Sequence, residues 1–173
     1  DVRFTEYDNG GTRVLLFLRQ HVGKMKNDAK TYHLDFGGEY DVYDATKDHA
    51  YLGRHAYLDL EIDHYAKCLV LLPAAIRSAK LTASSATRGG KVTLKLETRT
   101  VPESPKGLVD CWHVQVFGSD GIERRSHRCN VMSEGKGLAL ELPVALDAAK
   151  GTYRVVLTSA ASGVRAETTA EVR

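Results

Sequence analysis

The chain has 173 residues, of which 43% are hydrophobic and 27% are charged, proportions typical of a globular protein. It contains no apolar run of the roughly 18 residues that a membrane-spanning helix requires, so a membrane partner is not expected. The net charge of +2 is unevenly divided: residues 1–75 hold 9 Lys/Arg and 12 Asp/Glu, whereas residues 76–173 hold 15 and 10. The basic residues are spread along alternating segments and form no concentrated stripe, which argues against nucleic-acid binding.

The first residues, Asp1-Val2-Arg3-Phe4, contain neither an initiator Met nor the apolar core of a signal peptide. They already show a strand-like pattern. We therefore expect the chain to be part of a larger protein, with further sequence before Asp1.

The first half of the chain predicts short β-strands. Val2–Tyr7 and Thr12–Leu18 flank Asp8-Asn9-Gly10-Gly11, a strong hairpin signal because Asn and Gly tolerate positive φ. The apolar run over residues 15–18 indicates a central strand covered on both faces. Further strands are predicted over Tyr32–Phe36, Tyr40–Tyr43, Tyr57–Ile62 and Cys68–Leu72, with a turn near Tyr51-Leu52-Gly53. Six or seven strands of this kind would form a small sandwich.

Pro73 follows the last of these strands and ends the ladder, because proline has no N–H to donate. The charge balance changes sign nearby. The sequence therefore predicts two units, residues 1–73 and residues 76–173.

The second half alternates apolar and polar residues with the period of a strand that is buried on one face. The clearest runs are Val92/Leu94/Leu96, Trp112/Val114/Val116, Leu138/Leu140/Leu142 and Tyr153/Val155/Leu157. Glycine-containing turns separate them, and about seven strands fit between residues 76 and 173. We predict an all-β fold of two tandem antiparallel sandwiches, the second of them immunoglobulin-like.

Two aromatic residues support the immunoglobulin-like prediction. In such folds a tyrosine near the start of one strand donates a hydrogen bond to the backbone just upstream, and Tyr153 in the segment 147–155 fits this tyrosine corner. Trp112 fits the core tryptophan of the fold. Both are expected to serve packing.

The chain also resembles known modules. Residues 2–17, Tyr40–Asp44 with Tyr51–Gly53, and Leu69–Pro73 look like the β-sandwich that follows the catalytic barrel in many bacterial glycoside hydrolases. Residues 114–121, 140–146 and 151–153 resemble immunoglobulin-like or macroglobulin-like modules appended to such enzymes.

The resemblance implies a non-catalytic accessory region of a secreted, carbohydrate-active protein. Its partner would be a catalytic domain before Asp1 or another subunit, and its location extracellular or periplasmic. Because fold alone does not determine function, alternatives stay open.

The residues contain no phosphate loop, nucleophile elbow or zinc motif, so no catalytic, cofactor-binding or metal-binding residue is predicted. The enzyme alternative is a glycosidase carboxylate pair, for which the candidates are Asp35, Asp41, Asp59 and Glu61. Calcium could be held by Asp41, Asp44 or Asp48, since oxygen ligands in loops suit it. The alternative to both is that these are exposed polar residues.

Three cysteines leave a disulfide open. A hairpin at residues 118–121 would place Cys111 opposite Arg128, so that a one-residue bulge brings it to Cys129. Two reduced cysteines are the favoured alternative. Cys68, in an apolar run, is expected to be a buried free thiol.

Tyrosines are the best lead to a ligand, because their flat faces stack on sugar rings. Seven of the eight lie in the first half: Tyr7, Tyr32, Tyr40, Tyr43, Tyr51, Tyr57 and Tyr65. Tyr43 and Tyr57 fall on the polar side of their strands, so we expect them to be exposed and to be the candidates for binding a polysaccharide. The alternative is ordinary packing in a sheet.

Overall fold

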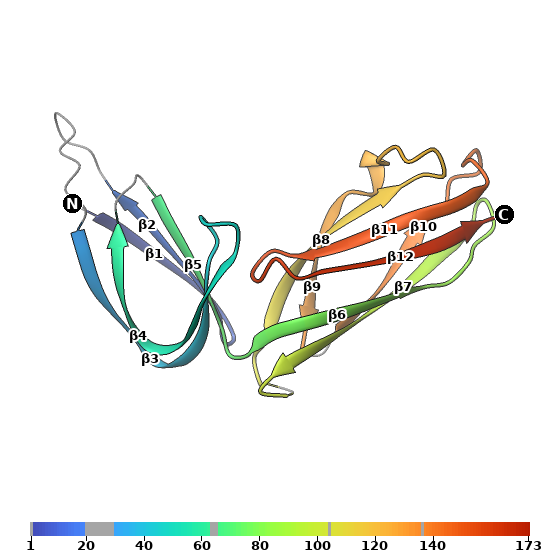
Figure 1. Ribbon diagram of the computed structural model, residues 1–173. Helices are drawn as coiled ribbons and strands as arrows, with labels where there is room; N and C mark the ends of the chain where they lie inside the picture. The colour runs from blue at the N-terminus through green and yellow to red at the C-terminus, as the bar shows by residue number, and fades with distance from the viewer. Residues whose placement is uncertain (1, 20–29, 63–65, 104, 136) are drawn as a thin grey trace, which may run out of the picture.

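The computed structural model describes residues 2–19, 30–62, 66–103, 105–135 and 137–173, and they form an all-β structure (Figure 1). The first sheet contains β1 (Val2–Asn9), β2 (Thr12–Arg19), β3 (Lys30–Asp44), β4 (Ala50–Ile62) and β5 (Ala66–Leu72). The second contains β6 (Ala75–Ala83), β7 (Lys91–Val101), β8 (Val109–Phe117), β9 (Cys129–Glu134), β10 (Gly137–Pro143), β11 (Gly151–Ser159) and β12 (Arg165–Val172). A short 3₁₀ helix, η1 (Arg125–His127), precedes β9. The predicted all-β fold with two antiparallel sheets is confirmed.

The first sheet has the order β1-β2-β5-β3-β4 and folds back on itself. The end of β3 pairs with β5, while its beginning pairs only with β4, and the β3–β4 hairpin curves over β1, β2 and β5 (Figure 1). The register shifts between Asp35 and Tyr40, where Gly37 has φ +68°. This bulge bends β3 without ending it, so the sheet has five strands rather than six or seven.

The core of the first unit lies between the curved hairpin and the flat strands. Leu15 and Phe17 of β2 are 3% exposed and pack against residues of β3, β4 and β5. The opposite face of β2 is open, since Leu16 is half-buried and Leu18 is 44% exposed. Among the described residues, the second layer of this unit covers one face of the strand, so the expectation that both faces are covered was wrong for Leu18.

The second sheet has seven strands in the order β12-β11-β8-β9-β10-β7-β6, as the turn spacing predicted. β9 and β10 share a single residue pair, Glu134–Gly137, so the sheet divides there into two layers. The outer strands approach again at the other side, where Ala86 forms a parallel bridge with Val172. One apolar core fills the space between the layers.

The two aromatic residues of the second unit lie as expected. Trp112 is fully buried in this core, and its indole Nε1 donates to the Ser133 hydroxyl at 3.1 Å. The Tyr153 hydroxyl donates to the Ala149 carbonyl at 2.9 Å. The predicted upstream hydrogen bond of the tyrosine is confirmed.

The cysteines do not approach each other as the disulfide alternative requires. Phe117 bridges to Glu123 and not to Ile122, and η1 then inserts extra residues before β9. Cys111 consequently pairs with Met132, and Cys129 pairs with Val114 three positions along β8. All three cysteines are free, and Cys68 is half-buried.

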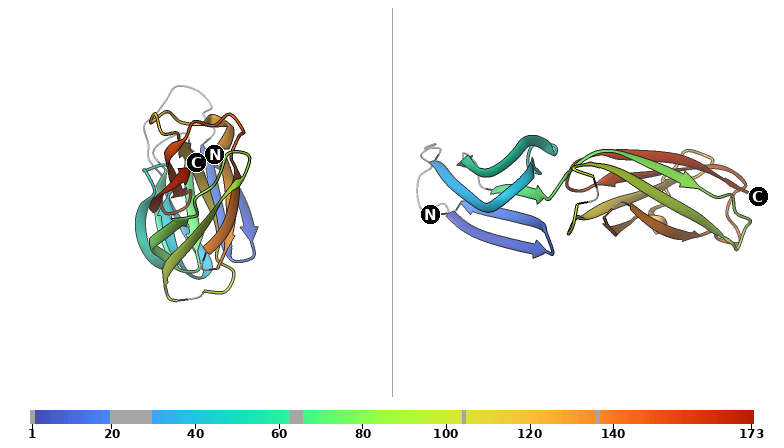
Figure 2. Two further views of the ribbon diagram at one scale, coloured as in Figure 1. Left: turned by 90° about the vertical axis from the view of Figure 1, so that its right-hand side faces the viewer. Right: turned by 90° about the horizontal axis from the view of Figure 1, so that it is seen from below.

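The two units follow each other end to end, with the chain termini at opposite ends of an elongated molecule (Figure 2). The connection is short: β5 ends at Leu72, β6 begins at Ala75, and Pro73 and Ala74 lie between them. That each unit is a separate domain stays a prediction. None of the described residues form a helix long and apolar enough to cross a membrane.

Tyr153→Phe removes one hydrogen bond and little volume. We expect it to lower the free energy of unfolding by about 1 kcal/mol, the usual net value of a buried hydrogen bond, in urea denaturation followed by Trp112 fluorescence. Tyr57→Phe is the control, because Tyr57 is 61% exposed. Equal effects of the two substitutions would contradict a structural role for the Tyr153 hydroxyl.

Candidate functional site

The most elaborate group of contacts in the molecule lies where the two sheets meet. Six buried residues form an apolar cluster that belongs to neither core, and we call it the junction cluster: Tyr43, Val70, Leu72, Ile76, Leu108 and Ala161. Its members come from β3, β5, β6, the β7–β8 connection and the β11–β12 turn. Segments from both units are therefore needed to exclude water from it.

A contact between glycines brings the units close at one side. The β1–β2 turn, Gly10-Gly11, lies against Gly107, and a Cβ atom added to Gly107 would be 2.1 Å from the Gly10 carbonyl oxygen. Next to this contact the Val109 N–H donates to the Thr12 hydroxyl at 3.0 Å. Only glycine allows this approach, because any side chain at residue 107 would overlap with backbone.

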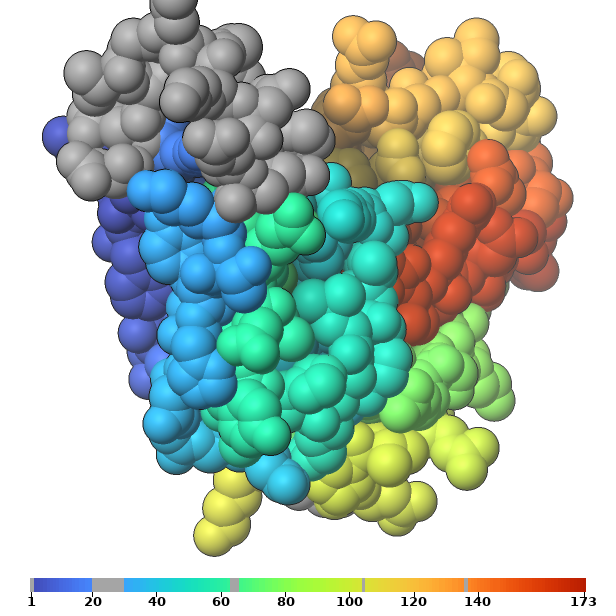
Figure 3. Space-filling view, turned by 60° about the vertical axis from the view of Figure 1, so that its left-hand side comes forward, coloured from blue at the N-terminus to red at the C-terminus, as the bar shows by residue number. Residues whose placement is uncertain are grey.

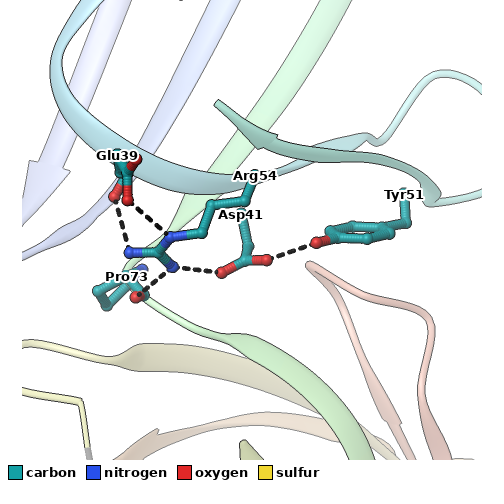
Figure 4. A network of polar contacts seen from close by, with 5 residues as sticks. All are labelled: Glu39, Asp41, Tyr51, Arg54 and Pro73. Carbon is teal, nitrogen blue, oxygen red and sulfur yellow. Dashed lines mark hydrogen bonds and ion pairs between the residues drawn. The ribbon is translucent and has the colours of Figure 1, made fainter. Parts of the chain in front are cut away.

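Charged side chains from β3 and β4 hold the start of the connection (Figure 4). Asp41 is 2% exposed, and its carboxylate accepts from Arg54 at 2.8 Å and from the Tyr51 hydroxyl at 2.6 Å. Arg54 also donates to the Pro73 carbonyl at 3.3 Å and to the Glu39 carboxylate at 3.2 Å. Arg54 thus links the first sheet to the residue at which the chain leaves it.

Tyr51 continues this network into the second unit. The Arg77 guanidinium of β6 lies 5.1 Å from the centre of the Tyr51 ring, within the range of a cation–π contact. On its other side the Tyr51 ring lies 5.2 Å from that of Tyr43. Tyr51 therefore contacts Asp41 of the first sheet and Arg77 of the second.

The expectation that Tyr43 is exposed was wrong. Tyr43 does lie on the outer side of its strand, but the second unit covers that side and leaves it 4% exposed in the junction cluster. Burial and the nearby Asp41 carboxylate raise the pKa of Tyr43 to about 12. Its ring has no free face on which a sugar could stack.

A third contact joins the β3–β4 turn to the β11–β12 turn. His49 Nδ1 lies 3.3 Å from the Ala161 carbonyl oxygen, and Figure 3 shows the two turns side by side, teal against red. Asp48 and His49 have φ of 51° and 59°. Two consecutive non-glycine residues in this region are strained, and contact with the neighbouring unit helps to maintain them.

A buried acid, Asp110, lies beside the junction cluster at the start of β8. It is 3% exposed, and neither carboxylate oxygen has a partner with normal hydrogen-bond geometry in the described part of the chain. Burial raises the pKa of Asp110 to about 6, and the nearby Ser159 hydroxyl, the N–H groups of Cys111 and Ala161, and His49 offset only part of this effect. Burial thus brings the pKa of this junction carboxyl close to neutral.

The calcium alternative does not agree with the structure. Asp41 is paired with Arg54, and Asp44 is buried against Lys67, with 2.8 Å between its carboxylate and the Lys67 ammonium. Burial opposes ionisation of Asp44, but hydrogen bonds from Lys67 and Thr46 bring its pKa below the ordinary value. The carboxylates of Asp41 and Asp44 therefore bind side-chain cations. Among the described residues, no group of three His, Cys, Asp or Glu side chains could hold a metal ion.

The remaining candidates share one exposed face of the β3–β4 hairpin. His33 pairs with Asp59, Asp35 pairs with Tyr57, and Glu61 follows on the same side. Tyr57 is 61% exposed, its ring lies 5.5 Å from the His33 ring, and His33 Nδ1 lies 2.7 Å from the Asp59 carboxylate. The structure thus brings together Tyr57 and three of the four candidate carboxylates, and places Asp41 elsewhere.

Sequence reasoning missed the residues that make the junction. Pro73 does lie between the last strand of the first sheet and the first strand of the second, and Gly10-Gly11 does form a turn. Nothing local to Arg54, Gly107 or Asp110 distinguishes them from other residues of their types, because their partners lie in distant segments.

Comparison with known proteins leaves the family open. No family model and no curated protein matches the sequence. Among solved structures, the β-glucuronidase of Parabacteroides merdae aligns at 15% identity and a TM-score of 0.34, covering 98% of this chain and 29% of that chain. β-Glucuronidase 3 of Bacteroides uniformis aligns at 10% identity and a TM-score of 0.35, covering 94% and 27%.

A chimeric titin Z1Z2-Z1Z2 tandem aligns at 15% identity and a TM-score of 0.32, covering 99% of this chain and 98% of that chain. The chain spans less than a third of the length of the β-glucuronidase chains. At these TM-scores the likeness carries no argument about fold or function.

Arg54→Met leaves the buried Asp41 carboxylate without its cation. We expect a loss of roughly 3 kcal/mol in the free energy of unfolding, as for other buried ion pairs that lose one partner. Adding Asp41→Asn should restore much of it, because the buried charge is then gone. Arg165→Met is the matched control: its pair with Glu167 is exposed, so the loss should be below about 1 kcal/mol. A double variant no more stable than Arg54→Met would contradict this account.

Ionisation of Asp110 should destabilise the folded chain. The pKa of this carboxyl is raised from the ordinary value of 3.8 to about 6, so the folded state binds the proton more tightly than the unfolded state does. Its contribution to stability is complete below pH 3.8 and is lost as the pH rises through about 6. Two pKa units correspond to roughly 3 kcal/mol.

Asp110→Asn removes this titration. Urea unfolding of both proteins between about pH 3.5 and 7.5 should show the variant gaining stability relative to the native chain as the pH rises. Parallel stability curves would show that Asp110 does not titrate as its burial implies.

Proposed function

We propose that this chain is a non-catalytic structural region of a larger carbohydrate-active protein, in which two β units act as one rigid body. The junction carries the proposal. Three kinds of contact join the units: an apolar cluster, a backbone contact between glycines, and the stacking of Arg77 on Tyr51. Flexible linkers lack such contacts, so the arrangement fits a spacer that holds other parts of a protein at a defined distance.

A partly apolar, exposed face of the first unit, which also carries Arg3 and Thr5, supports a packing role. The outer face of β1, β2 and β5 carries Tyr7 at 62% and Leu18 at 44% exposure, with Leu16 and Cys68 half-buried between them. A sheet face of this composition suits contact with a neighbouring domain or subunit. The carbohydrate-active character of the whole protein rests on the resemblance of the sequence alone.

Rotational diffusion tests whether the units form one body. ¹⁵N relaxation of the chain should give a single correlation time for β1–β5 and β6–β12, as expected for one particle of 19.0 kDa. Two shorter, different correlation times in the native chain would overturn the proposal. Hydrolysis of an aryl glycoside by the chain, with release of the phenol, that is abolished by Asp59→Asn would overturn the proposal that the chain is non-catalytic.

Gly107→Ala tests the contact that holds the units together. Its matched control is Gly121→Ala, because the two residues have φ of +72° and +75° but only Gly107 has an atom within 4 Å of an added Cβ. Both variants carry the same backbone strain. We expect Gly107→Ala alone to separate the correlation times, and a single correlation time in both variants would exclude the glycine contact as the cause.

A second function is favoured by the exposed face of β3 and β4. Tyr57 offers a free ring, and the neighbouring His33, Asp59 and Asp35 can hydrogen-bond to hydroxyl groups. This combination suits stacking of a sugar ring with polar contacts at its edge.

Binding to a panel of polysaccharides separates this function from a purely structural one. If the face binds sugar, Tyr57→Ala should weaken binding by about tenfold or more, the equivalent of 1.4 kcal/mol. Tyr7→Ala is the control, since Tyr7 is equally exposed on a different strand. Absence of binding across the panel, or binding that survives Tyr57→Ala, would exclude this face.

A further inference from the structure

The β10–β11 connection lies at the end of the second unit that is away from the first, near the C-terminus (Figure 1). A cavity lies beside this connection. It has a volume of about 370 Å³ and lies between the β10–β11 connection and the η1 segment. This volume is within the range of pockets that bind small molecules. Its inner wall consists of residues that are less than a tenth exposed, among them Val116, Leu142 and Val155.

The β10–β11 connection leaves this end of the core unfilled. It turns three small side chains, Ala145, Ala148 and Ala149, toward the cavity, while its large apolar residue, Leu146, is 81% exposed. A loop that closed the core would carry its leucine inward. The Tyr153 hydroxyl bonds to the Ala149 carbonyl, so the wall is held in place and the cavity does not depend on a ligand to form.

The opposite rim is formed by the segment around η1, which is rich in Arg and His. Four of the five residues from Arg124 to Arg128 are Arg or His. Arg124 pairs with Asp120 at 2.7 Å, and Arg128 pairs with Glu123 at 2.5 Å. Within the described residues, the side chains of Arg125 and His127 form no ion pair or hydrogen bond.

Of these two residues, His127 lines the cavity. The one acidic residue of the rim, Asp147, lies on the facing connection. A negative group would therefore be placed on the η1 side, away from Asp147.

We propose that this cavity binds a small amphiphilic carboxylic acid. The apolar body lies between the sheet layers against Val116 and Val155, and the carboxylate lies at the rim beside His127 and Arg124. Apolar walls reward burial of the hydrocarbon. At the rim, the Arg124 guanidinium and the His127 ring offer N–H donors to a negative head group, and they would oppose a positive one. This site is independent of the structural role proposed above.

Three probes with the same chain and different head groups test the proposal: octanoate, octanol and octylamine. Each is titrated into the whole chain and followed by ¹H–¹⁵N correlation spectra. We expect shifts at Val116, Ser126, His127 and Ala148, with octanoate binding at least about tenfold more tightly than octylamine. Equal affinities for all three, or no shifts at these residues with millimolar octanoate, would overturn the proposal.

Two variants separate the cavity from the rim. Ala148→Leu fills the cavity and should abolish binding of both octanoate and octanol, while Leu146→Ala, at the exposed residue of the same connection, should leave both unchanged. His127→Gln should weaken octanoate by several-fold and leave octanol unaffected. If Ala148→Leu does not fold, the three probes and the His127→Gln variant still test the proposal. Unchanged octanoate binding in His127→Gln would contradict the placement of the carboxylate.

Discussion

The backbone contact of Gly107 with the Gly10-Gly11 turn constrains how the two sheets sit. Only at this separation can Leu108, one residue later, reach the junction cluster, and Val109 donate to Thr12. The apolar cluster supplies most of the stabilisation, since burying a large apolar side chain contributes about 1.5–3 kcal/mol. Buried ion pairs roughly offset their own desolvation. The arginine network therefore specifies the geometry more than it adds to the stability.

Three buried carboxylates near the junction illustrate how environment decides the state of one residue type. Asp41 and Asp44 each face a side-chain cation, Arg54 and Lys67 respectively, and that partner offsets the burial of the negative charge. Asp110 is equally buried but has no such cation, so its neutral form is favoured. The junction thus combines contacts that persist at all ordinary pH values with one acid that responds to pH.

The candidate sugar-binding face and the proposed ligand cavity lie in different units of the molecule. The face with Tyr57 belongs to the β3–β4 hairpin of the first unit, and the cavity lies at the distal end of the second (Figures 1 and 2). A flexible linker would let these surfaces adopt any spacing. In the proposed rigid arrangement the buried junction would set their distance and hold what the two surfaces contact in a defined relation.

The local features of this protein follow from short stretches of the sequence. Strand alternation, the Gly10-Gly11 turn, the buried Trp112 and the Tyr153 hydrogen bond each depend on a few neighbouring residues, and each was predicted correctly. The resemblance to accessory modules of glycoside hydrolases stays a prediction. Three other features depend on how distant segments pack together: the burial of Tyr43, the separation of Cys111 from Cys129 and the pairing of Asp41 with Arg54. Alternation says which side of a strand a residue occupies, but what covers that side depends on segments distant in sequence, and a three-residue insertion such as η1 is enough to shift a register.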